Sequence, residues 1–171
     1  MDIRWLERIV LRDVESVKAE LAAFPDEASV WATPPGITNS AGTLALHLAG
    51  NLRHFVGTKL GGSTYVRKRD HEFAARGVPR AELLADLEQA IAAVRETLGG
   101  GRPIDLAAPF PETVGGKFRV ATGDWLIHLA THLAFHLGQI GYLRRIVTGG
   151  GSVSGVMGIA PLATAVKEGG T

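Results

Sequence analysis

Three histidines repeat at four-residue intervals between Trp125 and Gln139, and imidazoles at this spacing can bind a metal ion. His128, His132 and His136 are half of the six histidines in the chain. On an α-helix, a four-residue step turns the side chain about 40° beyond a full turn and rises about 6 Å. Neighbouring rings can therefore share one ion, as in helical zinc sites. His128 and His136, about 12 Å apart along the axis, cannot share one.

The apolar residues of the same segment indicate which pair faces the interior. With His132 at 0° and 100° per residue, the large apolar side chains lie between about 20° and 120°. His136 lies inside this arc at about 40°, His132 lies at its edge, and His128 lies outside it near −40°. The geometry favours His132 and His136 as ligands. The alternative is that each is a buried histidine that only makes hydrogen bonds.

A second polar line runs along the predicted helix at residues 41–60. His47, Asn51, His54 and Thr58 all point within about 40° of the direction of His47, beside an apolar stripe. Such a line is typical of a solvated helix side, but it also suits a ligand offered to a cavity. The spacing alone does not choose between His47 and His54.

Charged residues of both signs crowd the connector at residues 63–79. Arg67, Arg69 and Arg76 could bind a substrate carboxylate, but a solvated surface is the favoured explanation. No acidic residue lies on the histidine-bearing arcs, so a general acid or base would have to be Asp70 or Glu72. No catalytic residue is assigned from the sequence.

The composition restricts both the class of protein and the kind of site. The 171 residues, 46% hydrophobic and 20% charged, are ordinary for one globular domain. A net charge of +1 gives no electrostatic basis for binding nucleic acid or a membrane surface. There is no cysteine, so metal ligands must be nitrogen or oxygen. The charged N-terminal segment and the lack of a long apolar run predict a cytoplasmic protein without a signal peptide or membrane span.

Helical periodicity supplies the elements that would position these residues. It predicts four helices, at residues 3–24, 41–60, 80–98 and 122–148. With a long crossover at 102–121, containing a small hairpin at 113–120, they indicate an all-α four-helix bundle, an architecture that builds metal sites between facing helices. We expect one domain at residues 1–148 and a flexible, glycine-rich C-terminal tail at 149–171.

Two of these segments, taken together, resemble the DinB/YfiT-like superfamily. The stretch Thr43-Leu-Ala-Leu-His47-Leu-Ala-Gly-Asn51-Leu-Arg is similar to its first metal motif. The stretch His132-Leu-Ala-Phe-His136-Leu-Gly-Gln139-Ile-Gly-Tyr-Leu-Arg144 is similar to its HxxxH motif, which is followed by G-Q-I and an arginine. The connector around residues 65–73 resembles that of one branch, and the resemblance covers roughly residues 3–148.

The resemblance implies an up-down-down-up bundle, a homodimer, and a divalent metal ion, Zn or Ni, held by three histidines. By position in the motifs, these are His47, His132 and His136. His54 and His128 are additional to the motifs and could be outer partners, alternative ligands or surface residues. The second ring nitrogen of each ligand needs a partner, and the candidates are Asn51, Glu72 and Gln139.

Three neutral imidazoles with an open fourth position are typical of a catalytic metal ion. The resemblance implies a metal-dependent enzyme of thiol S-transferase or hydrolase type, acting on a small-molecule substrate or a small thiol. The alternative function is a dimeric metal-binding stress or accessory protein without turnover. Axial haem binding ranks lower, because it leaves a third histidine of the last helix unexplained.

Overall fold

The computed structural model describes residues 2–101, 103–151 and 158–167, and that part of the chain forms helices joined by loops, without an extended strand. In chain order the helices are α1 (Ile3–Ala22), α2 (Glu27–Val30), α3 (Ala41–Leu52), η1 (Arg53–Thr58), α4 (Arg69–Ala74), α5 (Arg80–Val94), η2 (Arg95–Gly99) and α6 (Thr122–Thr148). The segments η1 and η2 are π-helical continuations of α3 and α5. None of the described helices has both the length and the apolarity needed to cross a membrane.

Local signals in the sequence set the ends of the long helices. The Asp2 carboxylate accepts a hydrogen bond from the backbone N–H of Arg4 at 3.0 Å, and so caps α1. The Ser40 hydroxyl accepts one from the backbone N–H of Thr43 at 3.1 Å, and so caps α3. Gly149 ends α6 in the left-handed conformation, with φ of 78°, which glycine adopts without strain.

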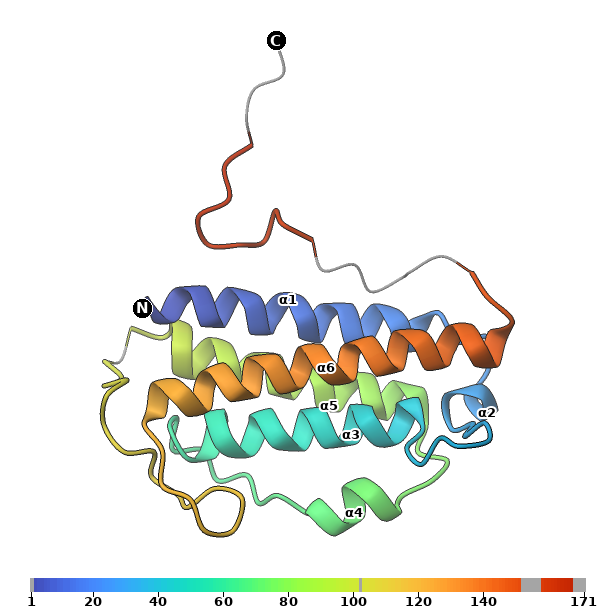
Figure 1. Cartoon of the computed structure of the whole chain (residues 1–171), viewed down its shortest axis with the longest axis horizontal. Coiled ribbons are helices and arrows are strands. Elements are labelled where there is room, and N and C mark those ends of the chain that lie inside the picture. The colour runs from blue at the N-terminus through green and yellow to red at the C-terminus, as the bar shows by residue number, and fades with distance from the viewer. Residues whose placement is uncertain (1, 102, 152–157, 168–171) are drawn as a thin grey trace.

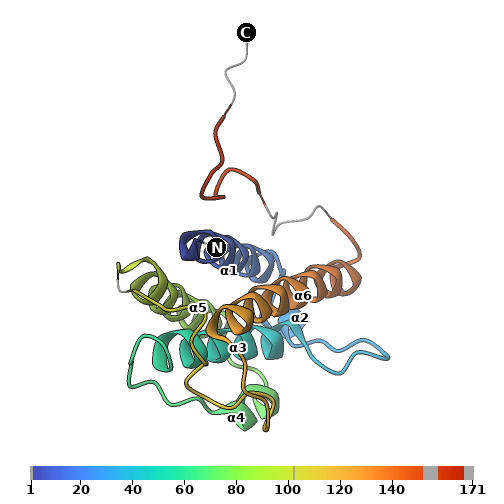
Figure 2. The ribbon, with the colours of Figure 1, turned by 60° about the vertical axis from the view of Figure 1, so that its left-hand side comes forward.

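The helices α1, α3, α5 and α6 pack around one hydrophobic core, as Figures 1 and 2 show. Each turns its apolar stripe inward, and burial of these side chains is the main force that holds the bundle together. The largest fully buried apolar side chains include Phe24, Leu21, Leu48, Leu52, Leu83, Leu87, Ile91, Leu129, Leu133 and Ile140. The short helix α4 lies outside α3 in both views, and this position makes the connector part of the site described below.

The loops contain more structure than the periodicity predicts. Helix α2 forms within the expected 26–39 loop, where the Asp26 carboxylate accepts a hydrogen bond from the backbone N–H of Ser29 at 2.7 Å. Helix α4 forms within the charged connector. The hairpin predicted at 113–120 is reduced to one antiparallel bridge, in which the backbone N–H groups of Val114 and Phe118 each donate to the carbonyl oxygen of the other, at 2.8 and 2.9 Å, without forming an extended strand.

A buried ion pair joins α1 to α6 inside the bundle. The Arg144 guanidinium donates from Nε to Oε2 of Glu20 at 2.5 Å, and the two residues are only 4% and 0% exposed. A charge removed from water is costly unless an opposite charge compensates it. This contact therefore explains the arginine that follows the histidine motif of α6, and it links that helix to α1.

We expect Arg144→Met to destabilise the protein by about 3–5 kcal/mol, because it removes the cation from a buried carboxylate. Urea unfolding at neutral pH measures the loss. Arg4→Met is the matched control, because Arg4 pairs with Asp2 on the surface and should contribute little. Equal effects of the two substitutions would contradict this assignment.

Residues 158–167 lie outside the bundle and form turns rather than a helix. A hydrogen bond links them to the core of the protein: Nη1 of Arg12 donates to the carbonyl oxygen of Gly158 at 3.4 Å. Flexibility is predicted for the tail at 149–171, of which residues 152–157 and 168–171 lie outside the described residues.

Candidate metal centre

Three imidazoles meet where α3 faces α6. Nε2 of His132 lies 3.2 Å from Nε2 of His47 and 3.1 Å from Nε2 of His136. One ring nitrogen from each residue lies within 4.8 Å of the other two. His132 and His136 come from successive turns of α6, and His47 comes from the facing turn of α3. The structure thus brings together the three histidines that the motifs single out.

These nitrogens have the spacing that a metal ion requires. Ligands about 2.0–2.1 Å from a tetrahedral ion lie about 3.3 Å from one another, close to the separations of the three Nε2 atoms. The donor set is three imidazole nitrogens, which suits zinc, nickel and other borderline transition-metal ions. The residues present therefore fit a divalent metal ion.

Two of the three rings have a partner at the other nitrogen. Nδ1 of His136 lies 2.6 Å from Oε1 of Gln139, and Nδ1 of His47 lies 3.1 Å from Oε2 of Glu72. Such contacts fix the tautomer that directs the Nε2 lone pair at a metal. Nδ1 of His132 is buried and has no hydrogen-bond partner among the described residues. Asn51, the remaining candidate partner, lies buried in α3 but is not among the described partners of these rings.

The buried carboxylate of Glu72 connects α4 to this cluster. Glu72 is 4% exposed, and Arg67 donates to it twice, from Nε to Oε1 at 2.7 Å and from Nη2 to Oε2 at 2.8 Å. Burial alone disfavours the ionised form, but the hydrogen bonds from Arg67 and His47 outweigh it and lower the pKa of the Glu72 carboxyl. Because both oxygens are engaged, Glu72 is suited to orient His47 rather than to transfer a proton.

The other charged side chains of the connector do not join the cluster. The guanidinium of Arg69 lies over the Phe73 ring, 5.0 Å from its centroid. Arg76 donates to the backbone carbonyls of Phe73 and Ala75, and Asp70 is exposed. Of the three arginines considered as receptors for a substrate carboxylate, Arg67 is already paired with a carboxylate of the protein itself.

Gly50, which sequence reasoning missed, makes room for this carboxylate. A Cβ atom at position 50 would lie 2.1 Å from Oε1 of Glu72, far inside contact distance. Gly50 is three residues after His47, so the glycine and the histidine present neighbouring parts of α3 to α4. A glycine inside a helix lowers its stability, and this was the available signal of a close approach.

We expect Gly50→Ala to displace Glu72 and to weaken metal binding by about 10- to 100-fold, the usual cost of losing a partner of a metal-bound histidine. Competition against a chromogenic chelator measures the dissociation constant. Gly138→Ala is the control, because a Cβ atom there meets nothing within 4 Å. If Gly50→Ala binds metal as tightly as the unmodified protein, Glu72 does not position His47.

Burial keeps two of the rings neutral. Desolvation, together with the nearby His136 and His47 rings, lowers the pKa of His132 from 6.5 to about 4. Desolvation also lowers the pKa of His136, although its contact with Gln139 acts in the opposite direction. A neutral imidazole has the free lone pair that a metal ion needs, so burial prepares these rings as ligands at neutral pH.

The metal-free protein should therefore lose stability as the pH falls from about 6.5 to 4. In this range the unfolded chain binds a proton at His132 that the folded protein does not, so acid favours unfolding by at most about 1.4 kcal/mol per pH unit for that proton. Urea unfolding in EDTA at several pH values measures the slope. His132→Leu should reduce it, whereas the exposed His71→Leu should not; an unchanged slope in His132→Leu would contradict the assignment.

The two remaining candidate histidines lie outside the cluster. Nε2 of His54 lies 3.0 Å from Oε2 of Glu112, which also pairs with Lys59 at 2.7 Å. The His128 ring stacks on Trp125 with a centroid separation of 4.7 Å. Neither belongs to the group of converging ligand atoms among the described residues, and each has a role in local packing or pairing.

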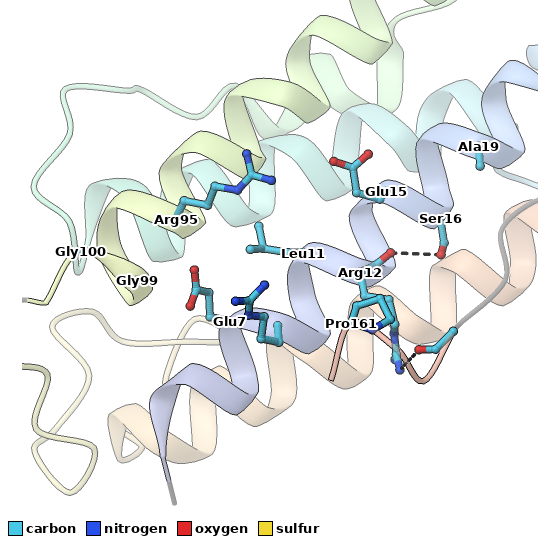
Figure 3. Close-up of a pocket in the computed structure, with 12 residues that line it drawn as sticks. Glu7, Leu11, Arg12, Glu15, Ser16, Ala19, Arg95, Gly99, Gly100 and Pro161 are labelled. Carbon is cyan, nitrogen blue, oxygen red and sulfur yellow. Dashed lines mark hydrogen bonds between the residues drawn. The ribbon is translucent and has the colours of Figure 1, made fainter. Parts of the chain in front are cut away.

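A cavity lies away from the histidine cluster, between α1, η2 and the residues that follow the bundle (Figure 3). Its volume is about 760 Å³. Charged side chains of both signs line it, including Glu7, Arg12, Glu15 and Arg95. It holds no histidine, so the metal chemistry belongs to the α3–α6 cluster.

Comparison with known proteins connects this cluster to a family. The sequence model of a family described as mycothiol-S-transferase matches residues 5–149, which include all three converging histidines as well as Glu72 and Gly50. No curated protein and no solved structure matches the chain.

Proposed function

We propose that this chain, which belongs to the mycothiol-S-transferase family of the DinB/YfiT-like superfamily, is a metal-dependent enzyme that joins the sulfur of mycothiol to a small electrophile. Family membership favours a thiol transferase over a hydrolase, and it favours an enzyme over a metal-binding protein without turnover. The observation that carries the proposal is the convergence of three imidazoles: Nε2 of His132 lies 3.2 Å from Nε2 of His47 and 3.1 Å from Nε2 of His136, and one ring nitrogen of each residue lies within 4.8 Å of the other two.

We propose different roles for the residues of the cluster and for the residues that contact it. We propose His47, His132 and His136 as the ligands of one divalent ion, either Zn or Ni. Such an ion lowers the pKa of a bound thiol or water and so supplies an anionic nucleophile at neutral pH. Glu72 and Gln139 hold the rings of His47 and His136 in the tautomers that binding requires.

The proposed transfer needs no cofactor besides the metal ion. The thiol proton passes to solvent, the sulfur lone pair forms a bond to an electrophilic carbon of the substrate, and the leaving group departs with the electron pair of the broken bond. The Phe73 ring covers the cluster on the side of α4, with its centroid 4.9 Å from that of the His47 ring, whereas Phe135 beside His136 is 63% exposed and leaves that side open to solvent.

We also propose a topology, a domain division, an oligomeric state and a location for this chain. In Figure 1 the colour advances in one direction along α1 and α6 and in the opposite direction along α3 and α5. These chain directions support an up-down-down-up order for the four helices. We divide the chain into a catalytic bundle at residues 1–148 and a tail at 149–171. A homodimer and a cytoplasmic location are proposed from the superfamily resemblance and the composition.

We expect protein purified without an affinity tag to contain about one divalent metal ion per chain and to convert mycothiol and an alkyl iodide into a thioether. His132→Ala should lose both properties, because it removes the central ligand, whereas His128→Ala should keep both. Elemental analysis and mass spectrometry of the product measure them.

Other outcomes would select other functions. Full metal occupancy in His132→Ala would overturn the ligand assignment. Ester or amide hydrolysis without thiol conjugation would identify a hydrolase. A metal-loaded protein with neither activity would support the accessory role.

A further inference from the structure

A second cavity lies beside the α3–α6 contact, about one helical turn from the histidines. Its volume is about 300 Å³, at the lower end of the range for small-molecule sites. The loop before α3 forms one wall, and α3 and α6 form the others. The residues that line it are Gly36, Ile37, Thr38, Asn39, Leu44, Gln139, Tyr142, Leu143 and Ile146.

The lining of this cavity is uncharged and mixes apolar side chains with the neutral polar groups of Thr38, Asn39, Gln139 and Tyr142. No acidic or basic side chain contributes to it, in contrast to the charged cavity of Figure 3. Three large apolar side chains at its edge remain open to solvent: Ile37 is 40%, Tyr142 is 69% and Ile146 is 59% exposed. Covering such surfaces with an apolar group is favourable, whereas a charged group would lose hydration without a partner.

The cavity adjoins the metal centre on both helices. Gln139 lines the cavity, and its Oε1 lies 2.6 Å from Nδ1 of His136. Leu44 lines it from α3 and precedes His47 by three residues, which is almost one turn. The side chain of Gln139 thus stands between the cavity and the His136 ring, and a molecule that passes this side chain would reach from the cluster into the cavity.

We propose that this cavity binds the uncharged apolar part of the electrophilic substrate, so that the enzyme prefers electrophiles with an alkyl chain or a small aromatic ring. The inference rests on the proposed thiol transfer for the identity of the ligand. The cavity determines which electrophile is chosen, while the histidine cluster determines the chemistry.

The kinetic test uses full-length, metal-loaded protein, mycothiol and the primary alkyl iodides from methyl to hexyl, with each rate divided by the uncatalysed rate. Each methylene that enters the cavity should raise kcat/KM about fourfold, until the cavity is filled. Ile146→Glu should abolish most of this gain. The ratio of kcat/KM for hexyl iodide to kcat/KM for methyl iodide should then fall at least tenfold. Ile127→Glu is the matched control, since Ile127 is 44% exposed on the same helix but does not line the cavity.

A second measurement requires neither metal nor turnover. Saturation-transfer NMR of 1-hexanol with the metal-free protein should show binding to the unmodified protein and to Ile127→Glu, but not to Ile146→Glu. Equal signals from all three proteins would overturn the proposal. The expected hexanol pattern without any thioether formation would leave the apolar site standing and reject the proposed transfer.

A second copy of the chain is the competing occupant of this surface, and molar mass in solution distinguishes it. If Ile146→Glu halves the molar mass and slows the methyl and hexyl reactions equally, the exposed side chains belong to a subunit interface and the proposal is wrong. An unchanged molar mass with a selective loss of the hexyl reaction supports it.

Discussion

The contact between α3 and α6 is the constraint on which the candidate site depends. It places Nε2 of His47 3.2 Å from Nε2 of His132, although 85 residues separate the two in the chain. Three imidazoles in a half-buried position lose hydration, and the lowered pKa of His132, about 4, reflects that loss. A metal ion bonded to the same nitrogens would more than compensate for it, because ligand binding to the folded state adds directly to stability. The bundle therefore holds its ligands in an arrangement that is unfavourable without a cation and favourable with one.

Helix α4 and the connector complete that arrangement from outside the bundle. The carboxylate of Glu72 enters against the backbone of α3 because Gly50 has no side chain, and Arg67 compensates its charge. The same carboxylate contacts Nδ1 of His47. The charged connector thus orients the ring of His47, the ligand proposed from α3, without contributing a proposed ligand of its own.

The side chains around the cluster differ in charge between the side of α4 and the side of the second cavity. Toward α4 the surroundings are charged and hydrogen-bonded, with Arg67 and Glu72 fixed to one another. Toward the loop before α3 they are apolar, with Leu44 and Ile146 among the cavity walls. The charged groups beside α4 are already paired with one another, so they orient the His47 ring. The uncharged cavity beside the loop before α3 offers the space that we propose for part of a substrate.

The sequence by itself determined the helical class, the approximate extent of α6, and the choice of His132 and His136 over His128, because each depends on spacing within one helix. It could not choose His47 over His54 from spacing, since both lie on one polar line; the choice came from motif resemblance. The packing of α3 on α6 brings His47 to the cluster and leaves His54 with Glu112. Gly50, the pairing of Arg67 with Glu72 and the apolar cavity likewise depended on tertiary structure, because they arise where separate helices and loops meet and no periodicity in one segment encodes them.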